Sequence, residues 1–151
     1  MKHLFILLFV FFILSCGQNN TPEPEASLSK ETVASFNIEL PAGWKHVKLQ
    51  GIDSRIGFFT NETDSLYYDF GRFTRGFEFF YGNNPAYTIK KIVIHKKPGQ
   101  WLYPRKNEEG ITGVFLQADS VNTLTITGKS KNTNSYYWNI FRTITFVKKE
   151  N

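Results

Sequence analysis

The chain has very few of the residues that build covalent crosslinks and metal centres. Its only cysteine is Cys16, so no disulfide can form within one chain. Its histidines, His3, His46 and His95, show no H-x-x-x-H spacing, and C-x-x-C is absent. A folded domain here must therefore be stabilised by packing alone, and neither a metal nor another cofactor is expected.

Motifs of the common catalytic and nucleotide-binding folds are also missing. There is no G-x-S-x-G nucleophile elbow and no glycine-rich phosphate loop. Asp69-Phe70-Gly71 matches the metal-binding tripeptide of kinases, but the 151-residue chain is too short for one and lacks H-R-D. A Ser-His-Asp triad could still assemble from distant residues. These absences favour a domain that is not an enzyme.

The charge is basic, but not strongly so. Eighteen Lys and Arg against thirteen Asp and Glu give a formal charge of +5. A nucleic-acid-binding domain usually carries a denser basic patch, so no nucleic-acid partner is expected.

The N-terminus begins with Lys2 and His3 and continues as an unbroken apolar run from Leu4 to Leu14. At ~1.5 Å per residue, this run is too short to cross a hydrocarbon core of roughly 30 Å. A charged start, a short apolar run and a small residue before the cut are typical of a secretory signal. A plain signal would carry A-x-A before its cut, and a buried core helix would have a polar face; neither is present.

Ile13-Leu14-Ser15, directly before Cys16, resembles the lipobox of bacterial lipoproteins. The resemblance implies cleavage before Cys16, thioether lipidation of its sulfur and acylation of the new amino terminus. Residues 1–15 are then a signal peptide. We expect the protein in the bacterial cell envelope, lipid-anchored to a membrane and facing the periplasm.

Composition divides the remaining chain. Residues 17–27 are polar and contain two prolines, which is typical of a flexible linker. We assign 16–35 to the lipidated cysteine and tether, with one helical turn possible at 29–35. Residues 36–147 form a single domain, and 148–151 are a tail.

Alternating apolar and polar residues predict short strands through the domain. They are expected at 36–40, 45–49, 55–60, 65–70, 87–95, 100–104, 111–116, 124–128 and 142–146. Segments 55–60 and 65–70 read as a hairpin, and 96–99 as a turn. The spacing of Tyr137, Trp138 and Phe141 predicts a helix over 134–141. The expected fold is α+β, an antiparallel sheet with one or two short helices on one face; the alternative is an all-β sandwich.

An opening strand, then P-A-G-W at 41–44, and a C-terminal helix leading into F-R-T-I-T-F at 141–146 resemble the frame of PsbP-like domains. These are mainly binding and assembly modules, so the resemblance implies the same α+β fold and no catalytic site. G-I-D-S at 51–54, Y-Y-D-F-G at 67–71 and G-I-T-G at 110–113 are similar to stretches of uncharacterised bacterial lipoproteins.

One segment concentrates positive charge, since no acid occurs between Glu78 and Glu108. Its cations are Lys90, Lys91, Lys96, Lys97, Arg105 and Lys106, with Trp101 and Tyr103 between them. We interpret it as a candidate surface for an anionic lipid or an acidic glycan. Lysines that protect a solvated strand edge explain the same residues.

Asp53 and Asp69 each lie in or beside a glycine-containing break. Two carboxylates can act as acid and base in glycan cleavage. Alternatively Asp53 closes its turn, while Asp69 pairs with Arg72 or Arg55. His46 and His95 are interpreted as solvated strand residues.

The stretch 66–81 holds eight aromatic residues, more than one buried strand face can take. Gly71 and Gly76 would mark bulges or a bend between two strands. Some rings should be exposed, or covered by the C-terminal helix. Trp44 and Trp138 are expected in one core.

Together these patterns predict a membrane-anchored envelope lipoprotein with a small, non-catalytic binding or scaffolding domain. Its partners would be the membrane, through acylated Cys16, and an envelope protein, glycan or anionic lipid. The alternatives are an envelope hydrolase using Asp53 and Asp69, and an inert structural or inhibitor lipoprotein.

Overall fold

The computed structural model describes residues 28–33, 35–106, 110–129 and 133–147. The predicted signal peptide, the lipobox, Cys16 and the tail at 148–151 lie outside these residues. Strand β1 (Leu28–Val33) lies inside the predicted tether, where it pairs antiparallel with β2 (Phe36–Pro41). A strand therefore stands where a helical turn was considered, and it precedes Phe36, the expected start of the domain.

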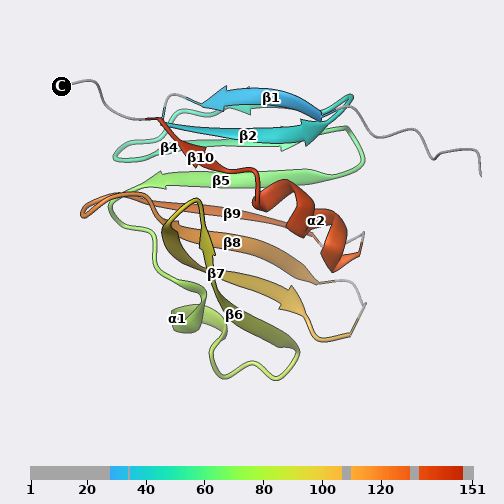
Figure 1. The fold of residues 1–151 in the computed structure, drawn as a ribbon, viewed down its shortest axis with the longest axis vertical. Coiled ribbons are helices and arrows are strands. Elements are labelled where there is room, and N and C mark those ends of the chain that lie inside the picture. The colour runs from blue at the N-terminus through green and yellow to red at the C-terminus, as the bar shows by residue number, and fades with distance from the viewer. Residues whose placement is uncertain (1–27, 34, 107–109, 130–132, 148–151) are drawn as a thin grey trace, which may run out of the picture.

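The strands form two antiparallel sheets, and in Figure 1 β1 and β2 of the smaller sheet lie at the top of the view while β6 of the larger sheet lies at the bottom. The smaller sheet has the order β1-β2-β10, where β10 is Thr145–Phe146. The larger sheet has the order β3-β4-β5-β9-β8-β7-β6. Its strands are β3 (Lys45–Lys48), β4 (Arg55–Thr60), β5 (Ser65–Gly71), β6 (Tyr87–Ile94), β7 (Lys97–Pro104), β8 (Ile111–Gln117) and β9 (Thr123–Lys129).

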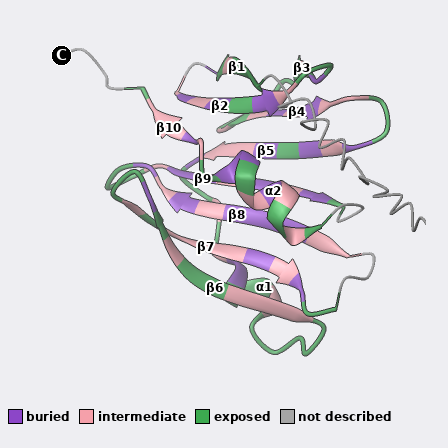
Figure 2. Ribbon diagram, turned by 45° about the vertical axis from the view of Figure 1, so that its right-hand side comes forward, coloured by how far each residue is buried: buried purple, intermediate pink, exposed green. Residues whose placement is uncertain are grey.

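Alternation in the sequence places the core between the sheets. Phe36, Ile38 and Leu40 of β2 are fully buried, while Asn37 and Glu39 between them are less buried or exposed. The Phe36 ring meets Phe59 of β4 at 6.5 Å and Tyr68 of β5 at 5.5 Å, both edge-on. The apolar face of β2 thus packs onto the larger sheet, where buried positions alternate along the strands (Figure 2).

Helix α2 (Asn134–Phe141) covers the rest of this face, with contacts to β2 and β8. Thr133 caps it, because its side-chain oxygen accepts a hydrogen bond from the Tyr136 N–H. Tyr137, Ile140 and Phe141 are its buried residues. The predicted helix at 134–141 is confirmed.

The predicted α+β class is wrong, because 54% of the described residues lie in strands and 12% in helices. It is mainly β and close to the alternative, an all-β sandwich. Period-two alternation identifies a strand but not the sheet that the strand joins. One sheet was therefore expected, whereas β1, β2 and β10 separate from the rest and form a second layer.

One local prediction is confirmed and another is wrong. The hairpin of β4 and β5 is confirmed, but the β6–β7 turn is His95–Lys96 and not 96–99. Both turn residues have positive φ, 45° and 67°, the type I′ pattern that suits a two-residue hairpin loop. Pro98 and Gly99 consequently lie within β7.

The aromatic stretch 66–81 forms a strand and a helix rather than two strands. Helix α1 (Phe77–Tyr81) packs beside β6 and β7. Phe77 is buried, whereas Phe79 and Phe80 are 64% and 62% exposed. Trp44 is buried as predicted, but Trp138 is only half-buried. No helix in the described ranges is both long enough and apolar enough to cross a membrane.

Candidate binding cleft

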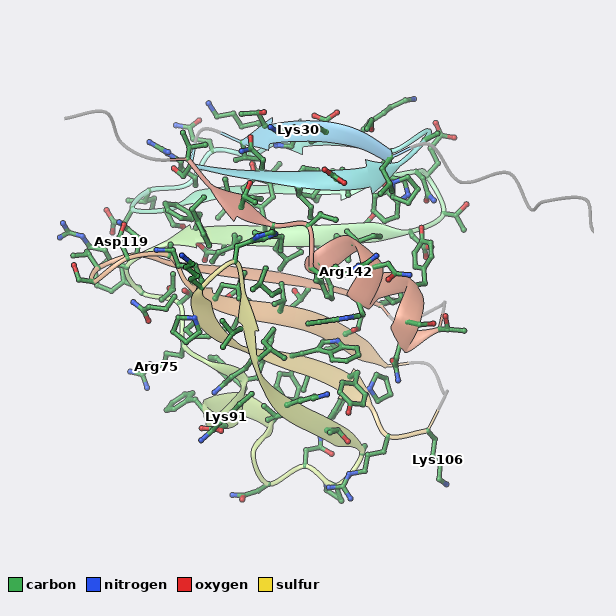
Figure 3. The ribbon with its side chains drawn as sticks, viewed as in Figure 1. Lys30, Arg75, Lys91, Lys106, Asp119 and Arg142 are labelled. Carbon is green, nitrogen blue, oxygen red and sulfur yellow. The ribbon has the colours of Figure 1, made fainter. Side chains whose placement is uncertain are left out.

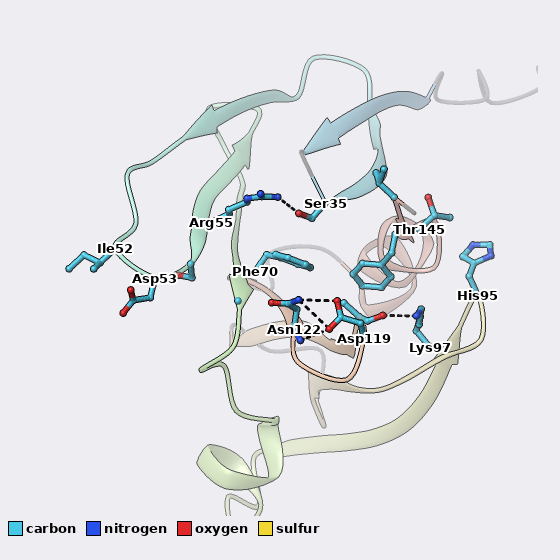
Figure 4. A pocket seen from close by; sticks show the side chains of 15 residues that line it. Ser35, Ile52, Asp53, Arg55, Phe70, His95, Lys97, Asp119, Asn122 and Thr145 are labelled. Atoms are coloured by element: carbon cyan, nitrogen blue, oxygen red, sulfur yellow. Dashed lines mark hydrogen bonds between the residues drawn. The ribbon is translucent and has the colours of Figure 1, made fainter. Parts of the chain in front are cut away.

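An open cleft of about 1080 Å³ lies where one end of the larger sheet meets the smaller sheet. Ser35 and residues 145–147 line it from the smaller sheet. The larger sheet contributes residues 52–55, the end of β5, the β6–β7 turn and the β8–β9 turn. Figure 4 shows these side chains around a central opening.

Two half-buried aromatic rings line the cleft, and we refer to them as its floor. Phe70 of β5 and Phe146 of β10 are half-buried, with ring centroids 6.4 Å apart. Phe70 also stacks on the fully buried ring of Phe36, at 6.4 Å and an interplanar angle of 29°. Because Phe36 belongs to the core, the floor rests on packed side chains that hold its rings in place.

Two cations flank this floor. Arg55, at the start of β4, donates a hydrogen bond from its guanidinium to the Ser35 hydroxyl. Lys97, at the start of β7, donates from Nζ to the Ala118 carbonyl at 2.5 Å and lies 5.9 Å from the Phe146 ring centroid. Figure 4 places Arg55 and Lys97 on opposite sides of Phe70.

The carboxylates of the cleft are oriented differently. Asp119 Oδ1 accepts hydrogen bonds from the backbone N–H groups of Val121 and Asn122, each at 2.8 Å. The Asn122 amide donates to both Asp119 oxygens, at 3.2 and 2.9 Å. Asp119 therefore closes the β8–β9 turn. Asp53 is exposed, and in Figure 4 its carboxylate is directed away from Phe70.

The structure does not bring Asp53 and Asp69 together in this cleft. Asp69 lies between Tyr68 and Phe70 on β5, so its side chain points to the opposite face of the sheet. There it faces Thr125 of β9, and neither Asp69 Oδ1 nor Thr125 Oγ1 has a hydrogen-bond partner. No ion pair joins Asp69 to Arg55 or Arg72.

The predicted basic surface is divided among separate places. Lys90 lies opposite Trp101 and Lys91 opposite Gln100, so these neighbouring lysines point to opposite faces of β6. Lys96 is exposed in the turn. Of these cations only Lys97 lines the cleft. Arg105 and Lys106 line a second hollow, of about 390 Å³, near the far end of β7, and Figure 3 shows Lys91 and Lys106 well apart.

Trp101 and Tyr103 are half-buried rather than displayed for a ligand. Trp101 stacks on Trp138 of α2 at 4.7 Å and contacts Tyr103 at 4.4 Å. Its indole N–H is buried and has no hydrogen-bond partner. The contact between Trp101 and Trp138 therefore links α2 to β7.

His46 is half-buried, and its Nε2 lies 2.9 Å from the Tyr68 hydroxyl. This contact differs from the solvated position predicted for it, whereas His95 is exposed in its turn. Burial raises the pKa of Tyr68 above its ordinary value. Among the residues that the structure describes, no three His, Cys, Asp or Glu side chains are grouped as metal ligands would be.

Comparisons with known proteins add little. No protein-family model and no curated protein matches the chain. A crystal structure from Bacteroides thetaiotaomicron VPI-5482 is similar over 76% of this chain, with 13% sequence identity and a TM-score of 0.47. The match spans 46% of that longer chain.

Proposed function

We propose that this chain is a lipid-anchored protein of the bacterial cell envelope whose β domain is a non-catalytic binding module. The cleft is its ligand site. The observation that carries this proposal is the pair of half-buried rings, Phe70 and Phe146, with a cation on either side. Binding pockets characteristically combine an apolar lining with a few convergent polar groups.

The anchor is supported by the sequence around Cys16. The apolar run and Ile13-Leu14-Ser15 form the signal, and Cys16 is the residue that would carry the lipid. Residues 17–27 separate it from β1. At ~3.3–3.6 Å per residue, this segment spans no more than about 40 Å. The cleft would then work close to the membrane surface.

A thermal unfolding screen tests the cleft as a ligand site. The full chain is heated with acidic oligosaccharides, neutral oligosaccharides, phospholipid headgroups and short peptides. A ligand at about 100 times its Kd should add roughly 2.7 kcal/mol to the unfolding free energy and so raise Tm. We expect at least one class to raise the Tm of the native chain but not that of an Arg55→Gln/Lys97→Gln variant.

The same samples test whether the domain is a catalyst. The compound that binds should be recovered chemically unchanged after prolonged incubation. Turnover by the native chain would contradict a non-catalytic module and would favour the hydrolase alternative, in which Asp53 is a candidate catalytic acid. Equal Tm shifts in the native chain and the variant would show that the cleft is not the site.

A further inference from the structure

Resting on the proposed function of the cleft, we infer its ligand class: an acidic oligosaccharide. Its sugar rings lie over Phe70 and Phe146, and its carboxylates meet Arg55 and Lys97. Three features of the cleft point to this class: the hydrogen-bonding capacity that it leaves unused, the chemistry of its floor and its open shape.

The hydrogen-bonding capacity that the cleft leaves unused belongs to its two cations, Arg55 and Lys97. A guanidinium has five N–H donors, and Arg55 uses one of them on Ser35. An ammonium has three, and Lys97 uses one on the Ala118 carbonyl. Asp119 already accepts from the backbone and side chain of its own turn, and Asp53 is turned away. Arg55 and Lys97 therefore keep N–H donors that no side chain of the cleft accepts, which suits a ligand with several anionic oxygens.

The floor suits a ring with C–H groups on its face. Aromatic faces carry partial negative charge, so they attract the slightly positive C–H groups of a sugar ring. Around the floor stand small polar side chains, Ser54, Asn122 and Thr145. Hydroxyls and amides both donate and accept, as recognition of sugar hydroxyls requires.

The shape argues for a chain of rings rather than an acyl group. The cleft holds about 1080 Å³ and is open to solvent. That is slightly above the ~300–1,000 Å³ common for pockets that enclose most of a small ligand. An acyl chain would need such an enclosed apolar pocket. Several sugar rings can instead lie along an open cleft, and cations on both sides match an acid group on more than one ring.

Calorimetric titration of the full chain in detergent micelles tests the ligand class. The probe is trigalacturonate, a trisaccharide with a carboxylate on each ring. Maltotriose has the same number of rings without charge, and tricarballylate has three carboxylates without a sugar ring. Because hydrogen bonds between charged groups are stronger than neutral ones, trigalacturonate should bind at least about tenfold more tightly than maltotriose. Tricarballylate should also bind more weakly, because it cannot stack.

Two double variants with the same change of charge locate the site. Arg55→Gln/Lys97→Gln removes both cleft cations and should weaken trigalacturonate binding by about tenfold or more. Lys90→Gln/Lys91→Gln removes two cations outside the cleft and should change the affinity by about twofold or less, since exposed charges act weakly through salt. Thermal unfolding of both variants checks that they are folded. If the cleft variant fails to fold, movement of the Phe70 and Phe146 ring resonances on titration of the native chain locates the ligand instead.

The outcomes separate the ligand class from the cleft itself. Equal weakening by the two double variants would mean general charge attraction and would overturn the inference. Tighter binding of maltotriose, lost in the cleft variant, would overturn the acidic class and leave the cleft as a binding site. The acidic class would also be overturned, and the cleft kept as a binding site, if trigalacturonate did not bind while another class of compound raised the Tm of the native chain but not that of the cleft variant. If no class of compound binds, both the ligand class and the cleft as a ligand site are contradicted.

Discussion

Replacing the same residue type at a buried and an exposed position tests the two-layer packing directly. Phe36 is fully buried between the sheets, while Phe79 on α1 is 64% exposed. Phe36→Ala and Phe79→Ala remove identical atoms, so intrinsic differences between the side chains cancel. Their difference in unfolding free energy measures the burial of Phe36 between the layers.

The expected cost follows from the contacts. The Phe36 ring meets three other rings, those of Phe59, Tyr68 and Phe70. An aromatic side chain buries about 150–250 Å², which at ~25 cal/mol per Å² is roughly 4–6 kcal/mol as an upper bound. Measured Phe→Ala costs in cores are about 3–5 kcal/mol, and we expect Phe36→Ala in that range. Phe79→Ala should lie within about 0.5 kcal/mol of the native chain.

Urea titration followed by circular dichroism measures both values. A domain of this kind has about 5–15 kcal/mol of stability, so Phe36→Ala should still fold but unfold at clearly lower urea. The dependence on urea should keep its slope, which shows that the unfolded state is unchanged. A loss below about 1 kcal/mol for Phe36→Ala would refute the packing of β2 onto the larger sheet. A comparable loss for Phe79→Ala would show that α1 is buried.

Three further results are expected. Trp138→Ala should cost about 1–3 kcal/mol in a urea titration, less than Phe36→Ala, because Trp138 is half-buried and stacks on Trp101; an equal cost would contradict that partial burial. Burial raises the pKa of Tyr68, so the unfolded chain loses its phenol proton at a lower pH than the folded chain does. The free energy of unfolding should therefore fall as the pH rises above the ordinary tyrosine pKa of 10.0, and it should fall less steeply in Tyr68→Phe. Identical alkaline slopes in denaturant titrations of the two proteins would refute this assignment. Cys16→Ser should abolish labelling by a radioactive fatty acid, because serine has no thiol to carry the thioether-linked lipid, and a labelled variant would exclude Cys16 as the lipid acceptor.

Most strands were predictable because their apolar residues alternate, as in β2 and β5, whereas β1 has apolar residues only at its two ends and was missed. Helix α1 was not, because aromatic residues favour strands by local propensity. Its position depends on a tertiary contact: Phe77 packs against Gly113 of β8, where a Cβ would come within 2.9 Å of the Phe77 ring. No pattern within residues 77–81 reveals that space.

The cleft was predictable only in fragments. Lys97 and Asp53 were named as candidates, but Phe70, Phe146 and Arg55 were not. These residues are far apart in the sequence, and topology alone joins them. Conversely, Lys90 and Lys91 are adjacent in sequence but lie on opposite faces of β6, because strand side chains alternate. A cluster of charge along a strand therefore does not predict a single charged surface.

The cleft depends on the second sheet, which explains why the site and the fold class were missed together. Phe146 and Ser35 come from the smaller sheet, whereas Phe70, Arg55 and Lys97 come from the larger one. The contacts that cross between them at the cleft include the Arg55–Ser35 hydrogen bond, the Phe70–Phe146 contact and the approach of Lys97 to the Phe146 ring. A ligand over both rings would add further links between the layers. Only the packed state presents both rings, so such a ligand binds the folded chain and not the unfolded one. Its binding must therefore raise the free energy of unfolding of the sandwich.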